Sequence, residues 1–185
     1  MLKYEGDYLK GEKNGKGKEY YKGQRKYEGE FLNGEKNGKG EEYVKYEIIF
    51  KGEYLNGKRN GKGKEFFDED LEFEGEYLNG KRNGKGKEYY SCLKLKFEGE
   101  YLYGKRHGKG REYYNNGVLK FEGEYLNGSK NGKGKEYYDS GVIKFEGEYT
   151  NGERDGKGKE YYNNGKLKFE GEYLNGKQKI KCQIF

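Results

Sequence analysis

The sequence predicts an all-β protein, an elongated and twisted antiparallel meander of about eight stacked β-hairpins. Three observations predict this fold: a fixed repeat, a period-two alternation of aromatic and charged residues, and glycines between the alternating segments. Without the repeat, 30% hydrophobic and 39% charged residues with no proline would suggest a disordered chain. The repeat therefore indicates a folded all-β protein and not a disordered chain.

One glycine marks the same position in every repeat and is taken here as position 0. Its spacing along the chain is 23 residues three times and then 24 residues four times: Gly6, Gly29, Gly52, Gly75, Gly99, Gly123, Gly147 and Gly171. The repeats begin near residues 4, 27, 50, 73, 97, 121, 145 and 169, and the last is incomplete or serves as a cap. Units of this size bury an apolar face by stacking on neighbours, so we predict a single array over residues 1–185.

Each repeat is expected to form two strands. Positions −2 to +3, such as residues 97–102, alternate between aromatic or apolar and charged residues, which is typical of a strand. Positions +11 to +15, such as residues 110–114, give the second strand. We expect the glycine-rich segment between them, residues 103–108 in that repeat, to be a loop because its glycines permit positive φ.

The loop length suggests that position +2 pairs with +11, which would place position 0 opposite +13. One face of the fourth repeat would then carry the rings, which lie across neighbouring glycines: Phe73, Gly75, Tyr77, Gly86, Glu88 and Tyr90. The other would be largely solvated: Glu74, Glu76, Leu78, Lys85, Lys87 and Tyr89. In this register Glu76 faces Lys87 as an ion pair.

Further turns are expected to link the repeats, at residues 22–23 and, in the longer repeats, at 115–117, 139–141 and 163–165. Residues 1–8 would form an edge strand, and edges invite pairing. The chain finishes on a different alternating segment, residues 179–185. We interpret it as a cap or as an oligomer edge, so that a homodimer would form through terminal strands; alternatively, the chain is one slice of a longer array.

Composition limits the chemistry. The two cysteines, Cys92 and Cys182, stand at non-equivalent positions, which argues against a disulfide framework and favours a reducing compartment. No metal site or cofactor is predicted. The longest apolar run is residues 48–50, too short for a signal peptide or a membrane span. We expect a cytoplasmic protein that associates with a membrane or the cytoskeleton.

The sequence does not predict an enzyme. Glutamates at positions −1, +1 and +13 recur in nearly every repeat, whereas a catalytic pair needs one specially tuned environment. The single histidine, His107, stands where other repeats have Asn and is interpreted as a loop hydrogen-bonding residue. Residues 80–86 resemble a phosphate-binding loop but lack the helix that should follow it.

Two candidate binding surfaces remain. The first is a ladder of aromatic residues offering a groove for a partner polypeptide, with a purely structural core as the alternative: Tyr54, Tyr77, Tyr101, Tyr125 and Tyr149. The second is a basic edge for anionic phospholipid, with a solvated edge as the alternative: Lys58, Arg59, Lys62, Lys81, Arg82, Lys85, Lys105, Arg106 and Lys109. Glutamates at +13 and a small net charge of +6 argue against nucleic acid.

These repeats resemble the MORN (membrane occupation and recognition nexus) repeat, whose pattern is close to YEGEW-x-NGK-x-HGKG-x-Y. Residues 4–17, 27–40 and 97–110 carry it most plainly, and residues 104–110 read GKRHGKG. The chain departs from the pattern in using Tyr or Phe, never Trp, at position +2. The resemblance implies a twisted antiparallel sheet without enzymatic activity. It also implies a scaffold that binds proteins through an aromatic-lined groove or meets phosphoinositides at a membrane.

Overall fold

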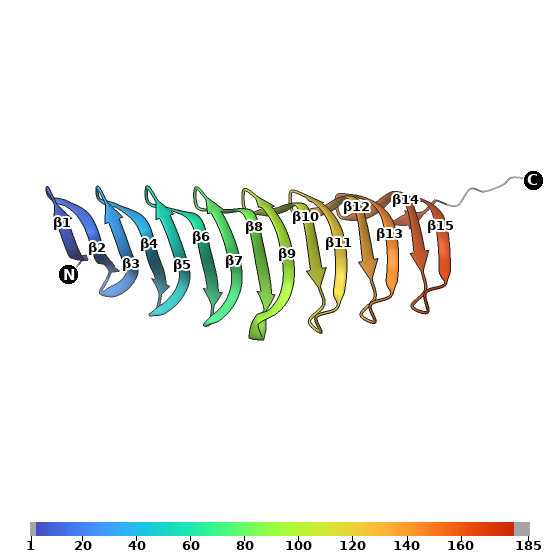
Figure 1. Cartoon of the computed structure of the whole chain (residues 1–185), viewed down its shortest axis with the longest axis horizontal. Helices are drawn as coiled ribbons and strands as arrows, with labels where there is room; N and C mark the ends of the chain where they lie inside the picture. The colour runs from blue at the N-terminus through green and yellow to red at the C-terminus, as the bar shows by residue number, and fades with distance from the viewer. Residues whose placement is uncertain (1–2, 180–185) are drawn as a thin grey trace, which may run out of the picture. The chain divides into compact units, whose positions relative to one another are not determined.

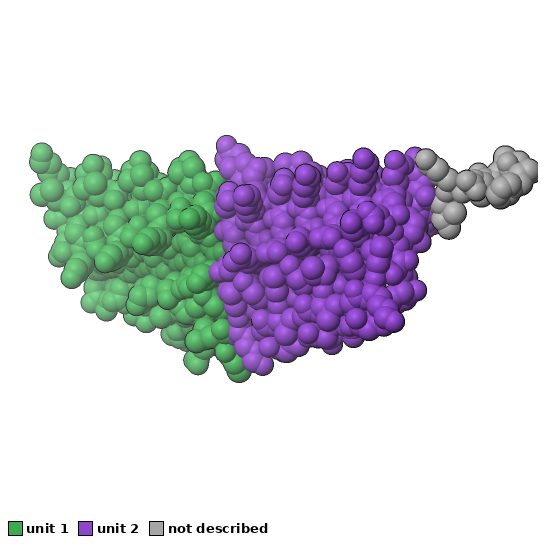
Figure 2. Space-filling model, turned by 45° about the vertical axis from the view of Figure 1, so that its right-hand side comes forward, with its two compact units in different colours: residues 1–93 green, residues 94–185 purple. Residues whose placement is uncertain are grey.

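The structure is a computed structural model, and it describes residues 3–179. The chain divides into two compact units, residues 1–93 and residues 94–185, coloured green and purple in Figure 2. The predicted closing strand lies, apart from Lys179, outside the described residues, as does Cys182.

Unit 1 contains eight strands in chain order, each antiparallel to the next (Figure 1). They are β1 (Tyr4–Leu9), β2 (Glu12–Tyr21), β3 (Gln24–Leu32), β4 (Glu35–Val44), β5 (Glu47–Leu55), β6 (Lys58–Phe67), β7 (Asp70–Leu78) and β8 (Lys81–Tyr90). A single 3-10 turn, η1 (Ser91–Leu93), follows them. Two successive strands form one hairpin, so unit 1 holds the first four repeats.

Unit 2 repeats this arrangement with β9 (Lys94–Leu102), β10 (Lys105–Tyr113), β11 (Leu119–Leu126), β12 (Ser129–Tyr137), β13 (Ile143–Thr150), β14 (Glu153–Tyr161), β15 (Leu167–Leu174) and β16 (Lys177–Gln178). The predicted all-β antiparallel meander of hairpin repeats is confirmed. Between residues 3 and 179 there is no helix of the length and apolarity that crossing a membrane requires.

The predicted long glycine-rich loop is wrong. The hairpin of the fourth repeat turns on two residues, Asn79 (φ 50°) and Gly80 (φ 84°), and β8 starts directly after them. Two successive positive φ values define a type I′ turn, whose twist matches that of the flanking strands and which Asn-Gly suits best. The next glycine, Gly84 (φ 80°), lies at a bulge inside β8.

The predicted register is also wrong, by two residues. Gly75 pairs with Gly86 and not with position +13, and Glu74, not Glu76, lies opposite Lys87. A shift of two residues leaves every side chain on its predicted face, because side chains alternate with period two. The predicted division into an aromatic and a charged face is therefore confirmed.

A ring lies across each pair of facing glycines. A Cβ atom on Gly52 would lie 2.7 Å from Cζ of Phe50, and one on Gly63 would lie 2.4 Å from the same atom. The Phe50 ring then meets Tyr54 of its own hairpin edge-on at 5.6 Å and Tyr77 of the next hairpin at 5.1 Å. This zigzag of rings joins successive hairpins within each unit.

The linking turns are confirmed. Residues 22–23 form a two-residue turn, and in the longer repeats an Asx contact closes the turn, as where the Val118 amide donates to Asn116 Oδ1 at 3.0 Å. At the other edge, the Gly57 amide donates to the Lys36 carbonyl of the preceding hairpin at 2.9 Å. At the linking edge, the Tyr114 hydroxyl donates to the Tyr137 carbonyl of the next hairpin at 2.8 Å, so both edges add contacts between hairpins.

We expect Gly63→Ala to lower the free energy of unfolding by about 2–3 kcal/mol, because its methyl group would overlap the Phe50 ring. The matched control is Gly57→Asn, since Gly57 (φ 76°) lies in a turn where an added Cβ atom would have no heavy atom within 4 Å, and Asn tolerates this φ. Urea denaturation followed by circular dichroism checks both. Equal losses for the two variants would contradict the proposed role of the glycine pair.

Candidate functional site

The aromatic face is closed. The five tyrosines predicted to line a groove are only 3–4% exposed. The hydroxyls of Tyr54, Tyr77 and Tyr149 are buried and make no hydrogen bond of standard geometry within the described residues. Burial, followed by the charge of Glu42, raises the pKa of Tyr54 above its usual range, and burial with Glu65 does the same for Tyr77. These rings therefore form the core and leave little ring edge for a partner.

A layer of cations covers the rings. The guanidinium groups of Arg59, Arg82 and Arg106 lie 4.0 Å from the ring centres of the phenylalanines at position −2 of their repeats. Such stacking is a favourable cation–π contact that also shields the ring from water. The nine predicted edge cations therefore do not share one side. Position +7 points to the aromatic face, whereas positions +6 and +10 point away from it.

Glutamates at position +13 connect these cations. Arg59 binds Glu42 of the preceding hairpin at 2.5 Å and Glu65 of its own hairpin at 3.3 Å. Arg154 does the same with Glu136 at 2.8 Å and Glu160 at 3.4 Å. The fork of donors on a guanidinium allows one side chain to bridge two hairpins. The sequence could have indicated this layer, because Arg or Lys at +7 accompanies Glu at +13 in every complete repeat.

The ion-pair layer changes the titration of its carboxylates. Burial alone would raise the pKa of Glu42, but the Arg59 hydrogen bond and the charges of Arg59 and Lys36 outweigh it, so that this pKa is lowered. The pKa of Glu136 is lowered in the same way by Arg154 and Lys130 against burial. Both carboxylates therefore stabilise the fold when ionised.

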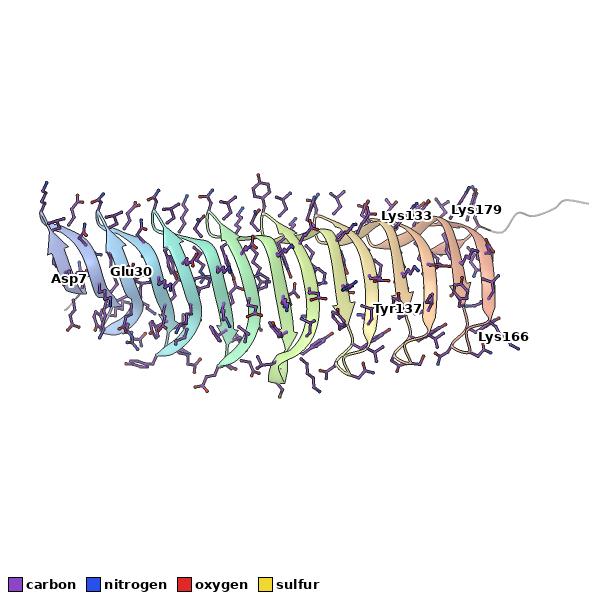
Figure 3. The ribbon with its side chains drawn as sticks, viewed as in Figure 1. Asp7, Glu30, Lys133, Tyr137, Lys166 and Lys179 are labelled. Carbon is purple, nitrogen blue, oxygen red and sulfur yellow. The ribbon has the colours of Figure 1, made fainter. Side chains whose placement is uncertain are left out.

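The opposite face, called here the ionic face, is open. It carries glutamates at −1 and +1, lysines at +10 and mostly lysines at +12, and Figure 3 labels Asp7 and Glu30 on it in unit 1 and Lys133 and Tyr137 in unit 2. Of the predicted edge cations, Lys58, Lys62, Lys81 and Lys85 are exposed in unit 1, as Lys105 and Lys109 are in unit 2. The structure thus keeps the lysines of the predicted edge on one face of each unit.

A groove of about 890 Å³ runs across β3–β8 on the ionic face of unit 1. Its floor is the backbone of a central row of glycines, because these positions would point any side chain to the opposite, aromatic face: Gly40, Gly52, Gly63, Gly75 and Gly86. One wall contains positions +1 and +10, and the other contains positions −1 and +12. Sequence reasoning missed this groove because it looked for a pocket among the rings.

The glutamates at position +1 have a structural task. Glu53 Oε2 accepts a hydrogen bond from the Lys62 amide at 3.1 Å, next to the bulge at Gly61. A Cβ atom at Gly61 would lie 2.0 Å from that oxygen, so the missing side chain makes room for the carboxylate. The joint recurrence of Glu at +1 and Gly at +9 was the available sequence signal.

A row of Tyr–Glu hydrogen bonds borders the other wall. Tyr89 donates to Glu74 at 2.6 Å, and Tyr137 donates to Glu122 at 2.8 Å. In the third repeat Lys51 replaces the glutamate, and Phe66 replaces the tyrosine. The hydroxyl is absent where its acceptor is absent, so the tyrosine at position +14 serves this contact in the repeats that carry both groups, such as the fourth and the sixth.

The single histidine lies within β10 and not in a loop, which corrects the predicted position. Its Nδ1 is buried and makes no hydrogen bond to any residue between 3 and 179. In the equivalent position of an earlier repeat, Asn60 Oδ1 accepts from the Asn79 amide at 3.4 Å. Within the described residues no three His, Cys, Asp or Glu side chains gather as a metal site.

Comparison with protein families gives a consistent result. The family model described as MORN repeat matches residues 4–24, 27–43, 50–69, 73–91, 97–118 and 121–143. A second model, described as MORN repeat variant, matches residues 154–175. Together these matches cover most of the array. No individual curated protein matches the chain.

We expect stability to fall as the pH is lowered through the depressed pKa values of Glu42 and Glu136. Their contribution is fully present above the ordinary pKa of 4.5 and is lost on protonation in the fold. Glu42→Gln should therefore cost about 1–2 kcal/mol at neutral pH, and this cost should shrink as the pH is lowered below the ordinary carboxyl pKa of 4.5. Urea denaturation across this pH range checks it. Glu47→Gln, at an exposed position, is the control, and a Glu42→Gln loss independent of pH would contradict the assignment.

Proposed function

The chain belongs to the MORN repeat family, and from this premise we propose that it is a non-enzymatic scaffold whose ionic face binds a partner polypeptide. The observation that carries the proposal is the 890 Å³ groove across β3–β8, which is open while the aromatic face is closed. The predicted tyrosines would then support the binding surface from behind and not contact the partner. A surface held by a closed core is preorganised, which reduces the entropy lost on binding.

The dimensions of the groove suit an extended chain. The five spacings of ~4.8 Å between its six strands give a length of ~24 Å, which is about seven residues of extended polypeptide. A backbone floor allows a partner chain to approach closely, because no side chain projects between the two walls. A small metabolite would fill only part of such a long, shallow groove.

The charges of the groove also favour a polypeptide. Five glutamates and six lysines line it, so its walls are nearly neutral overall. A mixed surface complements a segment that carries both acidic and basic residues better than it complements a polyanion. The same balance argues against a nucleic acid.

A second candidate is binding to anionic phospholipid through the exposed lysines of unit 1. Lys58, Lys62, Lys81 and Lys85 share the ionic face, and each basic residue near an anionic membrane contributes about 1 kcal/mol. Glu53 and Glu76 stand between them, which weakens this candidate relative to the first.

A photo-crosslinking amino acid in place of Lys62, on the groove wall, should form adducts with polypeptide in a native extract. The matched control replaces Tyr46, which is 72% exposed in a linking turn of the same unit. Adding Lys39→Glu and Lys85→Glu should lower the yield at position 62 severalfold, because both flanking charges are reversed. Mass spectrometry identifies the adducts.

Equal adducts at positions 62 and 46 would contradict the groove as the binding site. Adducts that consist of phospholipid would support the second candidate. In that case, sedimentation with phosphoinositide-containing liposomes should fall when Lys58, Lys62, Lys81 and Lys85 are changed to Glu.

A further inference from the structure

One wall of the ionic face carries a row of charges at positions −1 and +12, each directly opposite the next on the neighbouring strand. In unit 2 the signs alternate strictly along Glu98, Arg111, Glu122, Lys135, Glu146, Lys159 and Glu170. Glu122 and Glu146 therefore face a base on both sides, which is the arrangement that stabilises a sheet. Unit 2 therefore shows the alternating charge pattern without interruption.

Unit 1 breaks this alternation at one place. Glu41 stands at +12, where other repeats have a base, and Lys51 stands at −1, where other repeats have a glutamate. Their ion pair, at 2.8 Å, is kept with the charges exchanged. As a result Glu28 lies directly opposite Glu41, and Lys51 lies directly opposite Lys64. We call these four residues the charge step.

Neighbouring side chains are adapted to the like charges of the charge step. Arg25 binds Glu28 and stacks 4.0 Å from the ring centre of Tyr43. The Tyr43 hydroxyl donates to Glu41 at 2.5 Å, and Phe66 takes the place of the tyrosine that would have faced Lys51. Like charges on adjacent strands weaken a sheet, so the exchange has a cost that a plain alternating row avoids.

All four residues of the charge step line the groove. A strictly alternating wall presents the same neutral pair at every hairpin, so a partner chain could bind in several equivalent registers about 9.6 Å apart. The charge step replaces two of these pairs by one acidic and one basic hairpin. It therefore makes one register different from all others.

We propose that the charge step fixes the register of the bound polypeptide, an inference that rests on the function proposed above. The partner segment carries a basic residue over Glu28 and Glu41 and an acidic residue three positions away over Lys51 and Lys64. The two hairpins are ~9.6 Å apart, and a polyproline II chain advances ~9.3 Å in three residues while returning to the same side. Its i and i+3 side chains thus meet successive hairpins.

The test uses two proline-rich synthetic peptides of equal composition, one with Lys and Glu three positions apart and one with them adjacent. Chemical-shift titration of the ¹⁵N-labelled chain locates and measures binding. We expect shifts at the groove residues and a severalfold lower Kd for the three-position peptide. The double variant Glu41→Lys/Lys51→Glu keeps the ion pair, restores alternation and should abolish this preference.

A gain-of-function variant separates recognition from folding. Lys135→Glu/Glu146→Lys in the alternating variant recreates the same four-charge pattern in unit 2 and should restore the preference there. Equal binding of both peptides in the groove of the native chain would overturn the charge step and leave the proposed scaffold function standing. Binding of neither peptide to the groove at millimolar concentration would overturn both.

Discussion

The structure depends on one contact, an aromatic ring laid across two facing glycines. Phe50 over Gly52 and Gly63 is the clearest case, since a methyl group on either glycine would overlap the ring. This contact places the rings of one hairpin against those of the next, and it gives a single-layer sheet a core without a second layer. The low content of hydrophobic residues is sufficient to form this core, because a ring such as Phe50 contacts a pair of glycines and also the rings of its own and the next hairpin.

The closed core decides where function can lie. Arg59 and its equivalents complete the core on the aromatic face by stacking on the rings and bridging glutamates of two hairpins. The arginines of the predicted basic edge are therefore part of the core, whereas the lysines of that edge are exposed on the ionic face. A repeat of this kind separates its tasks by face: one face joins hairpins, and the other carries the rows of charges, in which Glu41 and Lys51 are exchanged relative to the other repeats.

Sequence reasoning identified the fold, the repeats and the composition of the two faces, because period-two alternation survives an error in register. It missed the two-residue Asn79-Gly80 turn because the second pair of glycines looked like more loop, whereas Gly84 belongs to a bulge. It could not find the groove, since a wall made of positions −1, +1, +10 and +12 exists only once the register is known. The ion-pair layer needed the same information, because Arg59 and Glu42 are distant in sequence and belong to different repeats.

In each unit the aromatic face is a closed core and the ionic face is an open surface. Hydroxyl-radical footprinting of the native chain, read by mass spectrometry, tests this arrangement directly. We expect Tyr54, Tyr77, Tyr125 and Tyr149 to be protected and Tyr21 and Tyr46 to be labelled at the rate of exposed tyrosine. Labelling of the first group as fast as the second would contradict it and would return the rings to the role of a binding groove.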